Sequence, residues 1–245
     1  MKALILAAGR GKRLGNAYDQ SKCMLEIDSK PLIEYSLDSA VATRAQELVI
    51  VVGHRADEIM KRYGREYRGR PIQYALQENQ NGLVHAIECA EKPIAGEDFL
   101  LLLGDEIMLR PCHEAMIHQF VAQRPFAICG VLIEKRRHRI SKTYSIIQDE
   151  SRKICRLIEK PRNPANDWMG TGSCIFRNEI YSYVERTPLN QNRGERELPD
   201  LIQCAIDDGE EIKSFTICEK YFNINSPEDL REATENSLLL SPTSS

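Results

Sequence analysis

Three short runs of almost unbroken apolar residues limit the folds open to this chain. They are Lys2–Ala7 (KALILA), Glu47–Gly53 (ELVIVVG) and Phe99–Gly104 (FLLLLG). A strand with one face in water alternates apolar and polar residues, whereas a strand covered on both faces is apolar throughout. Segments with helical spacing of apolar residues, such as Pro31–Val41, lie between these runs. The order predicts an α/β fold with a mostly parallel sheet that is covered by helices on both faces.

Strands and helices alternate up to about residue 125, and beyond it the sequence pattern changes. In the first part we also expect a strand at Pro71–Gln77 and helices at Ala56–Tyr63, just after Gly82, and at Pro111–Gln123. Beyond residue 125, short apolar runs are separated by polar turns, which predicts a smaller mixed β subregion. Its expected strands are Phe126–Ile133, Tyr144–Gln148, Ile154–Glu159 and Gly172–Phe176, and its expected helices are Tyr181–Arg186, Pro199–Asp208 and one capped by Ser226. We therefore predict one domain over residues 1–245, with lobes at 1–125 and 126–238 and a tail at 239–245.

Composition excludes several classes of protein. The 245 residues carry a net charge of −3, whereas a general nucleic-acid binder is usually basic, so we expect no nucleic-acid partner. The one basic run, Lys135–Arg139, is interpreted as a solvated loop, with a phosphate contact as the alternative. The eight cysteines form no C-x-x-C pair, and the five histidines lack metal spacing. The chain shows no leader and no apolar stretch of membrane length, so we expect a cytoplasmic protein with reduced thiols and no membrane partner.

The first apolar run leads straight into a glycine turn that carries positive charge. Residues 7–14 read A-A-G-R-G-K-R-L. The two glycines let the backbone turn tightly and approach a ligand, and three cations lie in the same turn. Exposed N–H groups beside such cations suit phosphate oxygens. We therefore expect a nucleotide to be bound here by Ala7, Ala8, Gly9, Gly11 and Lys12.

Two other phosphate-binding motifs do not fit this turn. The Walker A spacing G-x-x-x-x-G-K-[ST] is absent, and the dinucleotide fingerprint G-x-G-x-x-G would need a glycine where the chain has Leu14. The second mismatch disfavours a Rossmann-type oxidoreductase. Arg13 closes the turn and Lys22 follows nine residues later. Either cation alone would be read as solvated surface charge, but the combination indicates a site.

Polar residues follow several of the predicted strands. Asp105 comes directly after FLLLLG, where burying a carboxylate is unfavourable unless a cation pairs with it. It either caps the next helix or binds Mg²⁺, which prefers hard oxygen ligands, and we favour the metal. Gln77 offers an amide that can read the edge of a base, and Gly82 leaves room for a flat base. Because the carboxyl ends of parallel strands meet at one edge of a sheet, these residues are candidates for a single site.

Two further segments carry polar residues with more than one reading. Glu159 and Lys160 end a predicted strand, where Lys160 could hold a second phosphate and Glu159 could accept hydrogen bonds from sugar hydroxyl groups. The alternative is a surface ion pair in a turn. Asn223 precedes the last predicted helix, and it either caps that helix or supplies a neutral oxygen to a metal.

Taken in order, these segments resemble the sugar-1-phosphate nucleotidylyltransferases, and most of all their glucose-1-phosphate thymidylyltransferase branch. The resemblance extends over nearly the whole chain and implies a doubly wound, Rossmann-like sheet. The matching motifs are A-A-G-x-G-x-R at 7–13, Lys22, Q-x-x-x-x-G-L at Gln77–Leu83, G-D at Gly104-Asp105, E-K-P-x-N-P at Glu159–Pro164, T-G at Thr171-Gly172 and R-G-E-x-E-[IL]-x-D at Arg193–Asp200.

The resemblance also implies a reaction, in which an oxygen of a sugar 1-phosphate attacks the α-phosphorus of dTTP, UTP or CTP and pyrophosphate leaves. Lobe 1–125 would bind the nucleotide and lobe 126–238 the sugar phosphate. Arg13 and Lys22 would stabilise the transition state, and Asp105 and Asn223 would hold a Mg²⁺ cofactor. The base would be contacted by Gln77 and Gly82, and the sugar phosphate by Glu159, Lys160, Thr171 and Gly172.

Three positions depart from the family pattern. Lys12 stands where threonine is common, Asn223 where many relatives have a metal-binding aspartate, and Ser145 where a glycine borders the sugar. The last departure leaves the acceptor open. Two alternatives remain: a cytidylyltransferase for a non-hexose phosphate or phosphonate, and a non-catalytic nucleotide-sensing relative. The sequence also leaves open whether copies of the chain form a homo-oligomer.

Overall fold

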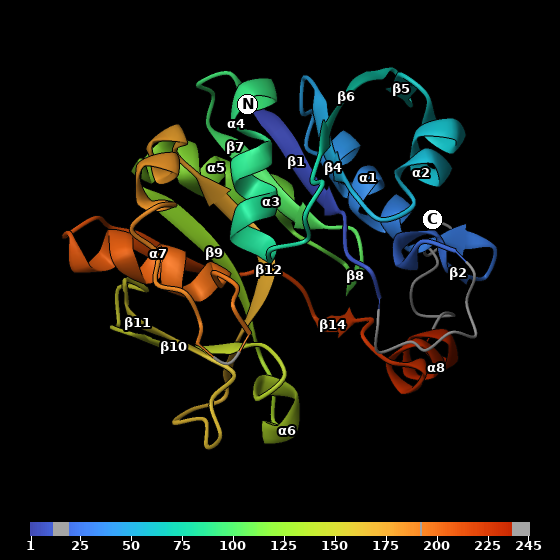
Figure 1. The fold of residues 1–245 in the computed structure, drawn as a ribbon. Helices are drawn as coiled ribbons and strands as arrows, with labels where there is room; N and C mark the ends of the chain where they lie inside the picture. Colours follow the sequence, from blue (N-terminus) through green and yellow to red (C-terminus); the bar gives the residue numbers. More distant parts are fainter. Residues whose placement is uncertain (12–19, 192, 237–245) are drawn as a thin grey trace.

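The computed structural model of the protein describes residues 1–11, 20–191 and 193–236 (Figure 1). Within these ranges the main element is a ten-stranded sheet. Its first half contains four parallel strands in the order β7 (Phe99–Leu103), β1 (Lys2–Ala7), β4 (Leu48–Val52) and β6 (Arg70–Leu76). The two-residue strand β5 (Glu66–Tyr67) pairs antiparallel with β6 at the edge. The three apolar runs of the sequence are thus neighbouring strands at the centre of the sheet.

The second half of the sheet is mixed. Strand β12 (Trp168–Phe176) pairs antiparallel with β7 and with β9 (Ala127–Ile133), and β13 (Ile212–Thr216) runs parallel to β9. Strands β10 (Tyr144–Gln148) and β11 (Ile154–Glu159) form an antiparallel pair that joins the start of β12. Since β12 lies directly beside β7, the two halves share one continuous sheet. The predicted division into two lobes stays a prediction.

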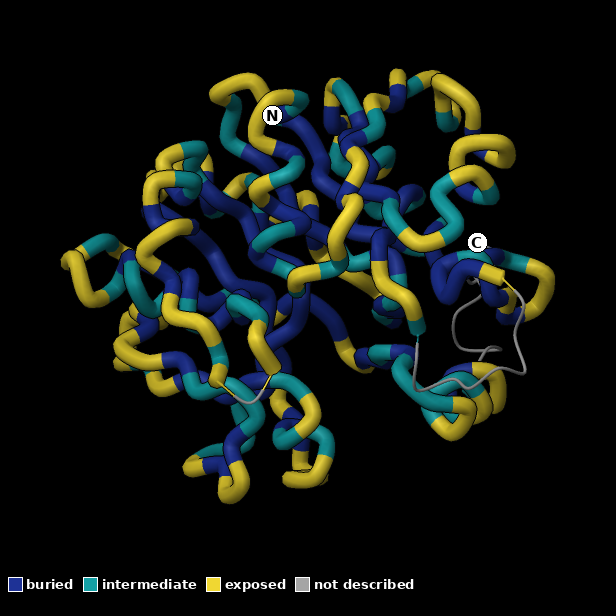
Figure 2. Tube along the Cα trace, in the orientation of Figure 1, coloured by how far each residue is buried: buried dark blue, intermediate teal, exposed yellow. Residues whose placement is uncertain are grey.

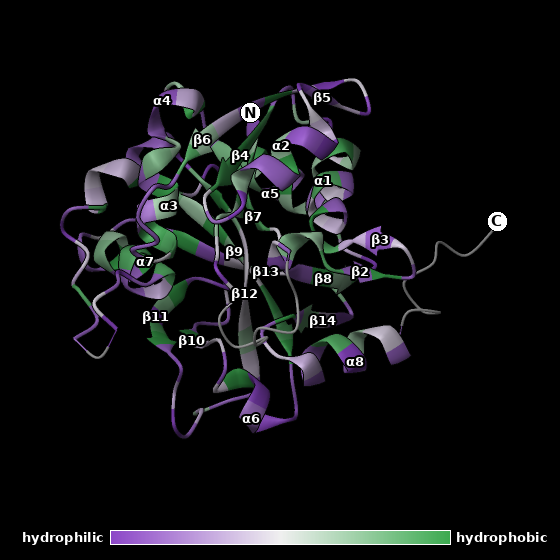
Figure 3. Ribbon diagram, turned by 45° about the vertical axis from the view of Figure 1, so that its right-hand side comes forward, coloured by the Kyte–Doolittle hydropathy of each residue, from purple (hydrophilic) through white to green (hydrophobic). Residues whose placement is uncertain are grey.

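Helices cover both faces of the sheet, because successive residues of a strand point to opposite sides. In β1, Ala3 and Ile5 pack in a cluster with α1 (Leu32–Ala42), α2 (Ala56–Tyr63) and α5 (His113–Gln123). Leu4 and Leu6 pack in the opposite cluster. The helices on that side are α3 (Leu83–Cys89), α4 (Glu91–Ile94), the 3₁₀ helix η3 (Asn178–Tyr183) and α7 (Leu198–Asp207). Figure 2 shows the central strands buried, and Figure 3 shows their apolar composition. The predicted α/β class is confirmed.

A smaller layer lies beside the main sheet. Strand β8 (Glu106–Leu109) pairs antiparallel with β14 (Lys220–Asn223), and α8 (Pro227–Glu235) follows β14 (Figure 1). Another short pair is formed by β2 (Glu26–Ile27) and β3 (Lys30–Pro31). A third apolar cluster joins this layer through the residues Leu25, Ile27, Leu32, Ile107, Phe222, Ile224 and Ala233. As predicted, Ser226 caps the last helix: its hydroxyl accepts a hydrogen bond from the Asp229 N–H at 3.2 Å.

One expectation about local structure is corrected. The segment predicted as a helix at Tyr181–Arg186 is instead the end of η3 and a turn, in which the Arg186 N–H bonds to the Tyr183 carbonyl at 3.1 Å. Pro188 follows closely and disfavours helical geometry at the residue before it. Strands β8, β13 and β14 were not predicted. None of the helices in the described ranges is long and apolar enough to cross a membrane.

Candidate active site

The carboxyl ends of β1, β6 and β7 open onto one cleft of about 560 Å³. The glycine turn follows β1, a polar loop follows β6, and Asp105 follows β7. Segments from far along the chain, around Glu195 and Asn225, complete the described part of its wall. The sequence-predicted residues that line this cleft are Ala8, Gly9, Gly11, Lys22, Gln77, Gly82 and Asp105.

Lys22 and Asp105 form an ion pair in this cleft. Lys22 begins a single 3₁₀ turn, η2 (Lys22–Met24), and only 8% of its surface is exposed. An ammonium group so far removed from water is unfavourable unless it is paired. Its Nζ donates to Asp105 Oδ2 and, at 2.9 Å, to Asn225 Oδ1. The pair therefore holds a positive charge in one position, next to the glycine turn.

Cys23, the next residue, also lines the cleft but is unsuited to act as a nucleophile. Burial and the neighbouring Asp105 carboxylate raise the pKa of the Cys23 thiol to about 12, although the Lys22 charge opposes this. The thiolate is the reactive form of cysteine. At neutral pH the Cys23 side chain is consequently a small apolar group against the cleft wall.

Gln77 and Gly82 lie together at the start of α3. Gln77 is 3% exposed, and its Nε2 donates to the Gly82 carbonyl at 2.9 Å and lies 3.0 Å from His85 Nδ1. The backbone at Gly82 has a φ of +92°, and a Cβ there would lie 2.8 Å from Cβ of Glu195. Glycine is therefore required at this position both by conformation and by space. Substitution of Gly82 by a residue with a side chain would disturb the contact between α3 and the segment that carries Glu195.

The residues expected from the sequence to bind the sugar phosphate do not line the described part of the cleft. They are Glu159, Lys160, Thr171 and Gly172. Thr171 is 1% exposed, and its hydroxyl donates to the Gly130 carbonyl at 2.9 Å. The Gly172 N–H donates to both carboxylate oxygens of Glu106, at 3.0 and 3.1 Å. These contacts place Thr171 and Gly172 inside the mixed sheet. Their expected contact with a sugar phosphate stays a prediction.

Glu106 is a buried acid directly next to Asp105. It is 4% exposed, and it accepts hydrogen bonds from the Tyr221 hydroxyl as well as from Gly172. Burial raises the pKa of Glu106 to about 8, although the two hydrogen bonds favour the charged form. Sequence reasoning did not find this residue, because its partners lie on strands that pair only in the folded chain.

Glu159 and Lys160 form an ion pair with each other at the end of β11. Burial raises the pKa of Glu159 despite this partner, and an Arg193 nitrogen lies 3.9 Å from its carboxylate. From the sequence, an ion pair was the alternative to a contact with the sugar phosphate. A role in binding the sugar phosphate stays a prediction.

Hard oxygen donors gather around the Lys22 ammonium, and they are the residues that could hold a metal. Asp105 offers a carboxylate and Asn225 an amide oxygen, while Asn223 joins them because its Oδ1 accepts from Asn225 Nδ2 at 2.6 Å. Within the described ranges no group of three or more His, Cys, Asp or Glu could bind a metal. Mg²⁺ is often held by one or two carboxylates together with substrate phosphates. One carboxylate with neutral oxygens beside a glycine turn fits that mode.

The remaining predicted residues fall into two groups. Lys12 and Arg13 lie outside the described residues, while Ala7 is the buried end of β1, with 1% of its surface exposed. Two further residues line the cleft: Arg10, which is one of the three cations that the sequence places in the turn, and Asn225, which the sequence did not single out. Arg10 bonds to Gln80 at 2.6 Å and so ties the glycine turn to the loop after β6, and Asn225 holds Lys22. Asn225 lies two residues from Asn223 in the same Asn-Ile-Asn segment. This proximity was the feature of the sequence that could have indicated Asn225 as a residue of the cleft.

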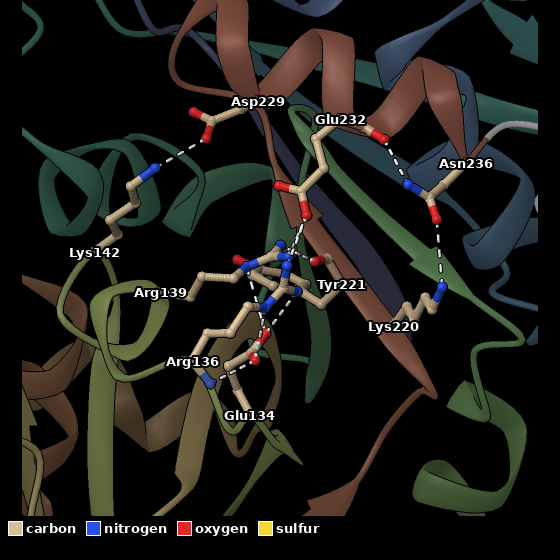
Figure 4. Close-up of polar contacts among 9 residues, drawn as sticks. All are labelled: Glu134, Arg136, Arg139, Lys142, Lys220, Tyr221, Asp229, Glu232 and Asn236. Carbon is tan, nitrogen blue, oxygen red and sulfur yellow. Dashed lines mark hydrogen bonds and ion pairs between the residues drawn. The ribbon is translucent and has the colours of Figure 1, made fainter.

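The basic run Lys135–Arg139 is not simply a solvated loop. Part of it forms the one-turn helix α6 (Arg137–Ile140), and Arg139 is only 12% exposed. Figure 4 shows Arg136 and Arg139 between the carboxylates of Glu134 and Glu232, the second of which lies on α8. The run therefore connects the end of β9 with α8. The pairing residues are too distant in the chain for the sequence to reveal this.

Comparisons with known proteins identify the family and its relatives. A family model described as "Nucleotidyl transferase" matches residues 2–238. The chain is 34% identical over 237 residues to a UTP–glucose-1-phosphate uridylyltransferase, AglF of Haloferax volcanii, and covers 96% of both chains. It is 30% identical over 247 residues to a glucose-1-phosphate thymidylyltransferase of Streptomyces griseus, covering 99% of this chain and 67% of that one.

Solved structures show the same fold. A UDP-glucose pyrophosphorylase complexed with UDP-glucose superposes with a TM-score of 0.87 at 22% identity, covering 98% of this chain and 99% of that chain. A putative glucose-1-phosphate thymidylyltransferase from Bacillus anthracis superposes with a TM-score of 0.86 at 20% identity, covering 100% of this chain and 97% of that chain. At this level of identity the likeness concerns the fold.

Proposed function

Because the chain belongs to the nucleotidyl transferase family, we propose that it transfers a uridylyl or thymidylyl group from UTP or dTTP to a sugar 1-phosphate. Glucose 1-phosphate is the first acceptor to test, since it is named for both relatives described above. The observation that carries the proposal is the buried ammonium of Lys22, which is held by Asp105 and Asn225 beside the glycine turn.

The proposed reaction needs no protein nucleophile. An oxygen of the sugar phosphate forms a bond to the α-phosphorus, and the bond from that phosphorus to the bridging oxygen breaks, so that the electron pair leaves with pyrophosphate. Such chemistry depends on positioning and on stabilising negative charge. Lys22 is already fixed in place by two partners, so it does not have to reorganise when charge develops. The protonated Cys23 thiol takes no part.

The proposal assigns a different part of the nucleotide to the segments that follow β1, β6 and β7. Backbone N–H groups of Ala8–Gly11 and the Arg10 side chain would bind phosphate oxygens, and Gln77 and Gly82 would contact the base. We also propose that Asp105 and Asn225, with Asn223 behind them, hold a Mg²⁺ ion. When bound, Mg²⁺ would neutralise charge on the phosphate oxygens.

A screen of pyrophosphate release tests the proposal. UTP, dTTP, CTP, ATP and GTP are each combined with a panel of sugar 1-phosphates and with non-hexose phosphates, with and without Mg²⁺. We expect turnover with UTP or dTTP and a sugar 1-phosphate. Turnover only with CTP and a non-hexose phosphate would favour the cytidylyltransferase alternative, and nucleotide binding without turnover would favour the nucleotide-sensing alternative.

Substitution of Lys22 tests the observation that carries the proposal. Lys22→Ala should lower kcat by roughly 10²-fold or more, because one preorganised charge is lost. Lys61→Ala, at a lysine whose side chain is 80% exposed, is the matched control and should retain wild-type turnover. Wild-type turnover in a folded Lys22→Ala protein would remove Lys22 from the site.

A further inference from the structure

The segment that carries Asn223 and Asn225 is held mainly by contacts made outside the main sheet. Strand β14 pairs with β8 in a separate two-stranded sheet, where Asn223 lies opposite Glu106. Beyond the end of β14, the Ile224 N–H donates to the Asp105 carbonyl at 3.0 Å. A two-stranded pairing is marginal by itself. The burial of Phe222 and Ile224 and the hydrogen bond from the Asn225 N–H to Asp229, at 3.0 Å, also hold this segment. The position of Asn225 against Lys22 depends in addition on what secures β14 from its other side.

Arg139 supplies that contact. Its Nη2 donates to the Tyr221 carbonyl of β14 at 2.6 Å, and its Nη1 donates to Glu232 of α8 at 2.9 Å. Its Nε lies 3.4 Å from a Glu134 carboxylate oxygen, and the guanidinium lies over the Phe222 ring at 5.6 Å. Figure 4 shows this one side chain between the end of β9, β14 and α8. A planar group with five donors can serve three partners at once in this way.

The same tyrosine contacts the other side of the layer. Its hydroxyl donates to Glu106, the residue after Asp105, while its carbonyl accepts from Arg139. Tyr221 is thus held at both its hydroxyl and its carbonyl, and only Phe222 separates it from the Asn223–Asn225 segment. A displacement of β14 would move Asn225 relative to Lys22 and Asp105.

Arg136 provides a natural comparison. It also binds the carboxylates of Glu134 and Glu232, at 3.1 and 3.0 Å, but its side chain is 52% exposed and its described contacts do not include β14. Each arginine can neutralise the two acids when the other is removed. The two residues therefore differ chiefly in the contact with the Tyr221 carbonyl and the Phe222 ring.

We propose that Arg139 is a positioning residue for the proposed active site: through Tyr221 it holds β14 so that Asn225 accepts from the Lys22 ammonium opposite Asp105. The inference rests on the proposed function for its effect on turnover. Its effect on the position of β14 and on Lys22 is independent of any substrate. A misplacement of about 1 Å at a reacting centre is enough to cost roughly 10²-fold in rate.

The test compares Arg139→Gln with Arg136→Gln. Three measurements are made on each full-length protein: hydrogen exchange of the backbone amides in β14, the rate of Lys22 acetylation by acetic anhydride followed by mass spectrometry, and kcat with KM for both substrates. Acetylation of exposed Lys61 serves as the internal standard. Arg139→Lys is added because it keeps the charge and the stem but cannot reach Tyr221 and Glu232 together, and it carries the test if Arg139→Gln does not fold.

In Arg139→Gln we expect amides of β14 to exchange about fivefold faster or more and Lys22 to acetylate faster. We expect kcat to fall roughly 10- to 100-fold while KM values stay close to wild type, and Arg139→Lys to lie in between. Arg136→Gln should match wild type in all three measurements. Equal changes in the two glutamine variants, or wild-type exchange and acetylation in folded Arg139 variants, would overturn the proposal. If wild type itself shows no turnover with any substrate pair, the proposed function fails, and exchange and acetylation still decide the role of Arg139.

Discussion

Lowering the pH should reduce the contribution that one buried ring, that of His113, makes to the stability of the folded protein. The residue begins α5, is 4% exposed, and its Nε2 lies 3.0 Å from the Ser173 hydroxyl. Burial lowers the pKa of His113 from 6.5 to about 4. The folded protein therefore keeps this ring neutral at a pH where the unfolded chain takes up a proton.

The sign and size of the effect follow from that difference. At His113 the unfolded chain binds more protons than the folded one below pH 6.5, so the contribution of this residue to the free energy of unfolding falls as the pH falls. Each pH unit between 6.5 and about 4 removes about 1.4 kcal/mol. Between pH 7 and pH 5 the contribution of His113 falls by about 2 kcal/mol. Glu106, whose pKa burial raises to about 8, contributes in the opposite direction over the same interval, so the effect of His113 is read from the difference between wild type and a His113 variant.

Urea denaturation followed by circular dichroism at pH 7 and pH 5 measures this loss. His113→Gln removes the titrating ring, so its free energy of unfolding should fall by about 2 kcal/mol less than that of wild type over the same interval. His118→Gln lies on the same helix at an exposed position and is the matched control, which should follow wild type. If wild type and His113→Gln lost the same free energy between the two pH values, burial of a neutral His113 would be the wrong account.

Two further substitutions test other parts of the structure. Gly172→Ala would place a Cβ against the Leu103 side chain and 2.8 Å from Glu106 Oε1, so we expect a loss of about 1–3 kcal/mol; an unchanged melting temperature would contradict the packing described. Asn223→Asp keeps an acceptor for Asn225 and adds a charge, so it should lower the Mg²⁺ concentration for half-maximal rate. An unchanged midpoint in that titration would leave Asn223 as a structural residue only.

The centre of the fold was predictable because burial on both faces leaves a direct mark on a strand. Ala3–Ala7 and Phe99–Leu103 are apolar throughout, as expected of strands that are buried on both faces. Lys220–Asn223 (KYFN) carries no comparable mark. Its strand conformation depends on pairing with β8, more than a hundred residues earlier, so local sequence could not indicate it.

The site was predictable to the extent that chemistry follows strand ends. Lys22, Asp105 and Gln77 were expected to meet, and the structure brings all three to one cleft. Glu106 and Asn225 were missed because their roles depend on side-chain partners that are distant in sequence. Solvated charge was the natural reading of Arg139 for the same reason, since its partner Glu232 lies 93 residues away.

The contact between Lys22 and Asn225 joins residues 203 positions apart, whereas Lys22 and Asp105 are 83 apart. Domains begin to fold from the N-terminus while the ribosome is still adding residues, at rates for which the stretch from Asp105 to Asn225 takes on the order of ten seconds. During that time the parallel strands can assemble, but the ammonium of Lys22 lacks the second of its two partners. The proposed reaction centre is thus among the last features of the nascent protein to be completed, and a product that terminates between Thr216 and Asn225 would contain every strand of the main sheet but not the second partner of Lys22.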